Sequence, residues 1–214
     1  MAQEERKGEE LNMARYTGPK HKIARREGVN ILEKSSSSLE RRLNVMPGSQ
    51  ARRGGRRKPS EYGLQLREKQ QLKRSYGLLE KQFRKYVEMA QKSRESTDEM
   101  LIQLLEGRLD NVVYRLGFAN SRNMARQFVG HGHVTVDGKK VSIPSYHVKI
   151  GEKVSLSKKI LKNEVLKLYI EETGKNLLSY LERKDTVGKL SKKPTRDEVP
   201  NPADYQLVIE FYSR

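Results

Sequence analysis

The sequence has no cysteine, and this absence excludes disulfides, thiol nucleophiles and zinc sites built on cysteine. It also lacks an apolar run of the roughly 18 residues that a membrane-spanning helix needs. Residues 1–30 have no apolar centre of a secretory signal, so we expect a cytoplasmic protein. The fingerprints of a phosphate-binding loop, a nucleophile elbow and a dinucleotide fold are missing as well, and we expect no cofactor.

Acidic residues are the other shortage, because 27 Asp and Glu stand against 44 Lys and Arg, and the formal net charge is +17 over 214 residues. Such an excess favours a polyanionic partner, since each phosphate that a basic side chain neutralises releases counterions. A membrane surface is the rival polyanion. Hydrophobic residues make up only 35% of the chain, so part of it is expected to order only on its partner.

The most informative stretch is residues 108–146. Apolar residues recur at i, i+3, i+4 and i+7 over residues 109–116, which predicts a short amphipathic helix. A second helix is predicted over residues 121–129, with Asn120 or Ser121 as its N-cap. The chain then alternates apolar and polar residues on both sides of Asp137-Gly138, a dipeptide that favours a type I′ hairpin turn. The stretch therefore predicts two helices followed by a hairpin.

Four arginines are expected on the polar side of these two helices. Arg108 and Arg115 lie two turns apart, and Arg122 and Arg126 lie one turn apart. Residues 108–150 contain seven Lys or Arg against two acids, so we expect one exposed arginine face that binds phosphate.

The residues before this stretch divide into three segments. Residues 1–12 are acidic and are predicted to be a disordered extension. Residues 13–60 form an extended basic segment that is too polar to build its own core. Its densest run, ARRGGRRKP, would in isolation fit a solvated tail or a targeting patch equally well, but its continuity with the rest of the chain favours RNA binding. Residues 61–107 show helical spacing with a break at Gly77, and Asp98 is expected to cap a short helix that follows.

Beyond the hairpin we expect further strands and one more helix. Residues 148–156 alternate around a glycine, residues 163–172 predict a helix, and residues 177–183 predict a strand. The last apolar run, YQLVIEFY at residues 205–212, predicts a terminal strand that closes the fold.

Several short motifs of this sequence resemble those of a known family. RLDNVVYRLGF, SRNMARQ, HGHVTV and IPSY, all within residues 108–146, resemble the RNA-binding module named after the fourth protein of the small ribosomal subunit. Outside the module, ARYTGPK, RKPSEYG, YGLLEKQF and VIEFYSR fit the same bacterial-type ribosomal protein, so the resemblance covers residues 13–214. Some relatives carry a cysteine zinc cluster near the N-terminus; this chain has none there, and we assign no metal.

The resemblance implies an α+β fold. Its parts would be a helical N-terminal domain over residues 61–107, rejoined by C-terminal residues, and a module of helix-turn-helix and antiparallel sheet over residues 108–175. The extended basic segment would precede them, and residues 176–214 would form a C-terminal segment with the closing strand.

The resemblance also implies a structural component of the small ribosomal subunit rather than an enzyme. Family members bind the five-prime domain of small-subunit ribosomal RNA directly, nucleate its assembly and contribute to translational accuracy. Their neighbours are the third and fifth small-subunit proteins and messenger RNA near its entry path, with no membrane and no small-molecule substrate.

The residues expected to bind RNA are basic side chains and histidines spread over these segments. They are Arg15, Lys20, Lys22, Arg25, Arg26, Arg52, Arg53, Arg56, Arg57, Lys58, Arg67, Lys69, Lys73, Arg74, Arg108, Arg115, Arg122, Arg126, His131 and His133.

Three alternatives stand beside this interpretation. Asp110 belongs to a tripeptide, RLD, that also occurs in pseudouridine synthases, where the aspartate acts on a flipped uridine. Here it falls inside a periodic helix with no strand-rich catalytic domain before it, so orienting an arginine or capping is favoured. His131, His133 and His147 would make a weak metal site, since no cysteine or obvious carboxylate accompanies them. A general architectural protein would bind duplex DNA as well as RNA.

Overall fold

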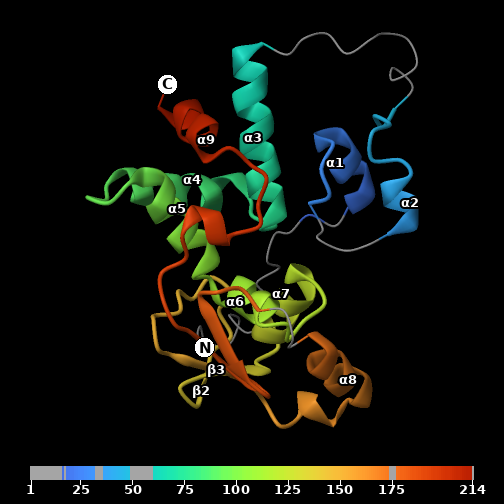
Figure 1. Ribbon diagram of the computed structural model, residues 1–214, viewed down its shortest axis with the longest axis vertical. Coiled ribbons are helices and arrows are strands. Elements are labelled where there is room, and N and C mark those ends of the chain that lie inside the picture. The colour runs from blue at the N-terminus through green and yellow to red at the C-terminus, as the bar shows by residue number, and fades with distance from the viewer. Residues whose placement is uncertain (1–15, 17, 32–35, 49–59, 174–176, 214) are drawn as a thin grey trace, which may run out of the picture.

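The computed structural model describes residues 16, 18–31, 36–48, 60–173 and 177–213. Its described part combines helices with one five-stranded antiparallel sheet, which confirms the α+β class. In Figure 1, α3, α4, α5 and α9 gather in one half, the sheet with α6, α7 and α8 forms the other, and α1 and α2 lie to one side.

The first half is built on amphipathic helices of different lengths. They are α3 (Glu61–Ser75), α4 (Glu80–Gln91), α5 (Thr97–Glu106) and α9 (Tyr205–Tyr212). Ser60 caps α3 by accepting a hydrogen bond of 3.2 Å from the backbone N–H of Gly63. Gly77 separates α3 from α4 with a φ of +62°, which confirms the predicted break. The predicted cap of α5 is wrong, because Ser96 occupies the cap position and Asp98 lies in the first turn, where it accepts a hydrogen bond from the Ser96 hydroxyl.

The second half begins with the two predicted helices. These are α6 (Leu109–Arg115) and α7 (Arg122–Gly130), followed by the 3-10 helix η2 (Ile160–Lys162), α8 (Glu164–Thr173) and, near the C-terminus, η3 (Arg196–Glu198). The side chain of Ser121 caps α7 by accepting from the N–H of Met124 at 3.3 Å. The helices predicted within residues 108–130 and 163–172 are therefore confirmed.

The sheet has the strand order β2-β1-β3-β5-β4, and all its pairs are antiparallel. The strands are β1 (Val134–Val136), β2 (Lys139–Lys140), β3 (Lys153–Leu156), β4 (Leu181–Lys184) and β5 (Val187–Leu190). Asp137 and Gly138 join the first hairpin with φ values of +46° and +78°, as a type I′ turn requires. Two predicted strands are shorter than expected, since only residues 153–156 of the stretch 148–156 and residues 181–183 of 177–183 are extended.

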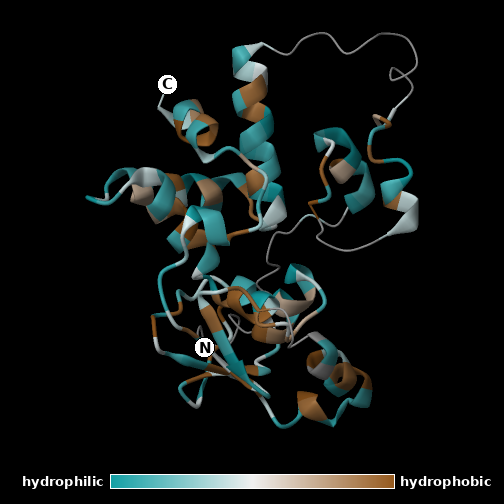
Figure 2. Ribbon diagram, viewed as in Figure 1, coloured by the Kyte–Doolittle hydropathy of each residue, from teal (hydrophilic) through white to brown (hydrophobic). Residues whose placement is uncertain are grey.

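One hydrophobic cluster runs through both halves. It extends in the sequence from Leu72 to Val208 and includes the inward residues of β1, β3 and β5. The sheet and α6 approach closely at Gly188, where a Cβ atom would lie 2.5 Å from the side chain of Leu116. Figure 2 shows hydrophobic residues on the helices and strands of both halves, whereas α1 is mostly hydrophilic.

The terminal strand predicted for residues 205–212 is wrong, because this segment is the helix α9. Asp204 caps it, accepting from the N–H of Gln206 at 2.9 Å, and Tyr205 and Val208 are buried on its inner side. The helix packs on α3, where the rings of Tyr62 and Phe211 lie 5.6 Å apart. A helix satisfies its own backbone hydrogen bonds, so α9 needs no strand partner in this position.

Residues 13–60 are also less extended than expected. Their described part contains α1 (Lys20–Glu27) and the short α2 (Ser37–Glu40), and Ala24, Ile31 and Leu39 form a small cluster of their own. The segment therefore buries a minimal core, contrary to the prediction.

Throughout the described residues, no helix combines the length and apolarity that crossing a membrane requires.

Candidate nucleic-acid interface

The four arginines of α6 and α7 lie inside the protein, so the prediction of one exposed arginine face is wrong. Arg108 is 3% exposed and Arg122 is 9% exposed. The side chains of Arg115 and Arg126 are 7% and 17% exposed. The spacing places them on one side of the helix pair, but carboxylates and carbonyls from neighbouring elements cover that side.

Glu106, the last residue of α5, is the centre of this buried network. Its side chain is fully buried and accepts hydrogen bonds from the hydroxyls of Tyr76 at 2.6 Å and Tyr180 at 2.8 Å. Arg115 donates to the same carboxylate at 3.2 Å. A single carboxylate thus joins α3, α6 and the segment before β4.

Asn111 extends the network to α7. Its amide donates to Glu106 at 2.6 Å, while its carbonyl oxygen accepts from Nε of Arg122 at 2.8 Å. Burial acts to raise the pKa of Glu106, but the guanidiniums of Arg115 and Arg122, with hydrogen bonds from Arg115 and Tyr76, outweigh it and lower this pKa to about 2. Glu106 is therefore ionised and compensates the buried arginines.

Asp110 is the second buried anion, and two arginines hold it. Arg108 donates to both of its oxygens at 3.0 and 2.8 Å, and Arg126 donates to Oδ2 at 2.9 and 2.7 Å. Arg108 also donates to the hydroxyl of Tyr86 at 2.7 Å. Asp110 is 2% exposed, so its carboxylate orients arginines and does not face a substrate.

Arg126 links α7 to the turn between α3 and α4. Besides Asp110, it donates to the carbonyl oxygens of Gly77 at 2.8 Å and Tyr76 at 3.1 Å. These carbonyls belong to the end of α3, where a cation is favoured. The residue therefore fixes the two halves of the protein against each other.

Three of the basic side chains on α3 that are expected to bind RNA are also paired with carboxylates. Lys69 and Lys73 contact Glu80 at 2.9 and 2.7 Å, and Arg74 forms an ion pair with Glu27 of α1. Burial would raise the pKa of Glu80, but hydrogen bonds from Lys73, from the Tyr212 hydroxyl and from Lys69 lower it to about 2. These cations hold α1, α3 and α4 together, and they are poorly placed to bind a phosphate at the surface.

The remaining expected residues that the structure describes lie nearer the surface. Lys20, Lys22, Arg26 and Arg67 are exposed, and Arg25 is half-buried, donating to the carbonyl of Val45 at 2.9 Å.

The two histidines beyond α7 pack on each other. His131 is exposed, and its ring lies 6.1 Å from that of His133, which in turn meets Phe128 edge-on at 6.4 Å. Within the described residues, no group of three or more His, Asp or Glu side chains is arranged to hold a metal ion.

The other expected residues fall outside the part of the chain that the structure describes. They are Arg15, Arg52, Arg53, Arg56, Arg57 and Lys58, and the predicted acidic extension at residues 1–12 lies there too.

Four lysines around the first hairpin were not among the expected contacts. Lys139, Lys140, Lys149 and Lys153 are exposed, and none of them forms an ion pair with a residue whose placement is described. Lys139 pairs with Val136 across the first hairpin, and the carbonyl oxygen of Lys153 accepts a hydrogen bond of 2.9 Å from the N–H of Asp137, so both lysines lie near the turn of that hairpin. A Lys-Lys pair directly after an Asp-Gly turn is a sequence signal that could have identified this patch.

Comparison with known proteins matches residues 15–106 to the Ribosomal protein S4/S9 N-terminal domain and residues 107–154 to the S4 domain. The small ribosomal subunit protein uS4 of Dictyoglomus thermophilum is 47% identical over 211 residues, which covers 94% of this chain and all of the relative. The protein of the same name from Akkermansia muciniphila is 45% identical over 205 residues, with the same coverage.

Proposed function

Because this chain belongs to the family of the small ribosomal subunit protein uS4, we propose that it is a structural component of that subunit and binds small-subunit ribosomal RNA directly. The observation that carries the proposal is the division of its basic residues into two sets. One set is buried against Glu106, Asp110 and Glu80 and shapes the protein. The other, on α1 and around the first hairpin, faces solvent without acidic partners among the described residues.

Recognition through the exposed set would depend on charge and shape. The deep, narrow major groove of an A-form helix hides the base edges, so a protein contacts phosphates and 2′-hydroxyls instead. Lysines on flexible stems, such as Lys139 and Lys140, suit phosphates whose positions differ from one site to the next. The buried arginines would contribute indirectly, by keeping the exposed surfaces at a fixed spacing.

The finer parts of the proposal rest on the family resemblance. The RNA target would be a helical junction in the five-prime domain, bound early in assembly. The third and fifth small-subunit proteins and messenger RNA near its entry path would be neighbours, and the protein would contribute to translational accuracy in the cytoplasm.

The salt dependence of RNA binding tests the hairpin surface. We expect the double variant Lys139→Ala/Lys140→Ala to reduce the slope of log K against log salt by about one for each phosphate that the protein no longer neutralises. Filter binding of the full chain to small-subunit ribosomal RNA over a salt series measures it. Lys189→Ala is the matched control, because Lys189 is already paired with Glu182 at 2.8 Å.

Three results would contradict the proposal. The slope of the double variant could equal that of the control, which would exclude the hairpin lysines as phosphate contacts. The expressed chain could fail to sediment with small ribosomal subunits. Duplex DNA could compete as well as the RNA at fixed salt, which would indicate a general architectural protein.

A further inference from the structure

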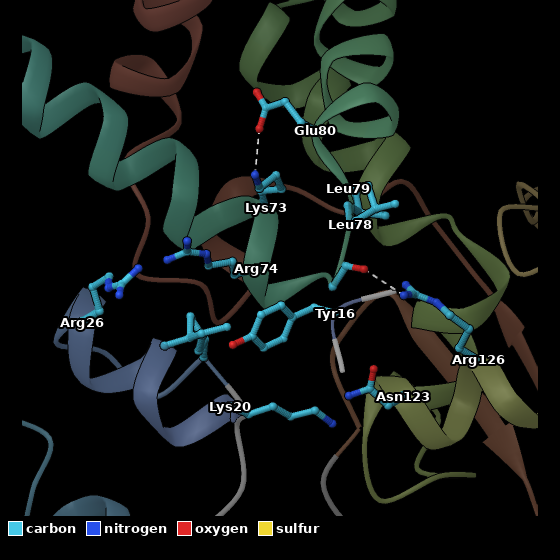
Figure 3. A pocket seen from close by; sticks show the side chains of 13 residues that line it. Tyr16, Lys20, Arg26, Lys73, Arg74, Leu78, Leu79, Glu80, Asn123 and Arg126 are labelled. Atoms are coloured by element: carbon cyan, nitrogen blue, oxygen red, sulfur yellow. Dashed lines mark hydrogen bonds and ion pairs between the residues drawn. The ribbon is translucent and has the colours of Figure 1, made fainter. Parts of the chain in front are cut away.

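We propose that the cleft between α1, the α3–α4 turn and α7 binds a single unstacked nucleotide, with its base against Tyr16 and its phosphate against Lys20 and Arg26 (Figure 3). This inference rests on the proposed RNA-binding function and names one contact of it. The cleft measures about 410 Å³, which falls in the range of sites for small ligands. It is too small for a duplex and large enough for one base with its sugar and phosphate.

The charge of the cleft favours an anion. Five basic side chains line it; Lys73, Arg74 and Arg126 are already paired with carboxylates, and this leaves Lys20 and Arg26 as the lining cations without an ion pair to a described residue. Arg126 is fixed in the wall by Asp110 and two backbone carbonyls. Lys20, by contrast, is exposed and forms no ion pair with a described residue, so it is available to a phosphate.

The floor and one wall of the cleft suit a base. Leu78 and Leu79, at the turn after α3, supply apolar surface. The Tyr16 ring lies over the backbone of Gly18, where a Cβ atom would come within 2.5 Å of its hydroxyl, so glycine permits this position. Tyr16 is 52% exposed, and Figure 3 places its ring in the cleft between Lys20 and Arg74. An exposed aromatic face in a basic cleft stacks well on a base that has left its helix.

Asn123 supplies a polar group on the opposite wall. It is exposed on α7, and Figure 3 shows it across the cleft from Arg26. Its amide carries both donors and an acceptor, so it can bond the edge of a base. The nucleotide could come from the bound RNA or from a free nucleoside monophosphate, since both present a base and a phosphate.

The stacking contact can be tested with two tyrosines of similar exposure. We expect Tyr16→Ala to weaken the affinity of the full chain for small-subunit ribosomal RNA by about 5- to 150-fold, the range for losing one base–aromatic stack. Tyr62→Ala is the matched control, because Tyr62 is 50% exposed on α3 and lies outside the cleft. Tyr16→Phe keeps the ring and should bind within about twofold of the parent chain.

Saturation-transfer NMR with each of the four nucleoside monophosphates separates the two sources. Monophosphate binding that disappears in Tyr16→Ala identifies a free nucleotide as a ligand. If Tyr16→Ala weakens the affinity for RNA and the parent chain binds no monophosphate, the ligand is a nucleotide of the RNA. Equal RNA affinities for Tyr16→Ala and Tyr62→Ala, with no monophosphate binding, would overturn the inference while leaving the proposed function intact. A parent chain that does not bind the RNA would overturn the proposed function itself.

Discussion

At the scale of single residues, some arginines of this chain are buried in ion pairs and others face solvent. Their spacing in the sequence does not distinguish the two groups. The sequence predicts that Arg108, Arg115, Arg122 and Arg126 share a side of the helix pair, and in the structure their side chains bond to the linked residues Glu106, Asp110 and Asn111. It does not predict that this side faces inward, because that depends on where Glu106 lies in space. A prediction based on the local excess of positive charge therefore overestimates the phosphate-binding surface of residues 108–150.

The Glu106 carboxylate gives this conclusion a measurable consequence. We expect Glu106→Gln to lower the free energy of unfolding by about 3–5 kcal/mol near neutral pH, because it leaves buried arginine charge uncompensated. Urea denaturation of the full chain, followed by circular dichroism, measures the loss. Glu99→Gln, an exposed position on the same helix, is the control and should stay within about 0.5 kcal/mol of the parent.

The stabilising effect of Glu106 should also depend on pH. Its folded-state pKa of about 2 lies below the ordinary value of 4.5, so the stabilisation is present above pH 4.5 and is lost as the pH falls toward 2. The difference between parent and Glu106→Gln should shrink over that interval. A difference that stays constant from pH 5 to pH 2 would show that the carboxylate charge is not responsible.

At the scale of elements, long periodic segments were predictable and one short apolar run was not. The helices α3, α4, α6 and α7 and the Asp-Gly hairpin follow from spacing and turn chemistry. Residues 205–212 fit both periods, because positions 205, 207, 209 and 211 are all apolar while Tyr205 and Val208 lie one helical turn apart. Packing on α3 decides between them, and Asp204 before the run was the local helix signal.

The cap of α9 tests this assignment. We expect Asp204→Ala to lower the free energy of unfolding by about 1 kcal/mol, because the N–H of Gln206 is left without its acceptor. Asp204→Asn retains a capping oxygen and should be nearly as stable as the parent. The nearby pair with Arg196, at 3.9 Å and exposed, should contribute little. Equal losses in both variants would attribute the effect to that charge pair instead of the cap.

At the scale of the whole molecule, the described residues group according to the hydrophobic core that they belong to, and not according to their order in the sequence. One hydrophobic cluster and the Glu106 network join α3–α7, the sheet and α9. Among its described residues, the lobe of α1 and α2 has Ala24, Ile31 and Leu39 as its buried apolar residues, and an Arg74–Glu27 ion pair attaches it to α3. The sequence indicated the weakness of this lobe through its polarity, but it did not indicate that two helices form.

The small core of this lobe predicts a difference in local stability. Backbone amides of α1 should exchange with deuterium at least about tenfold faster than those of α5, because so few buried contacts oppose local opening. Hydrogen-exchange mass spectrometry of the full chain measures both helices in one sample. Adding small-subunit ribosomal RNA should slow exchange in α1 more than in α5, since RNA on Lys20, Lys22 and Arg26 would stabilise the closed lobe. Similar protection of the two helices without RNA would contradict the weak-lobe argument, and unchanged exchange of α1 with RNA bound would place the interface elsewhere.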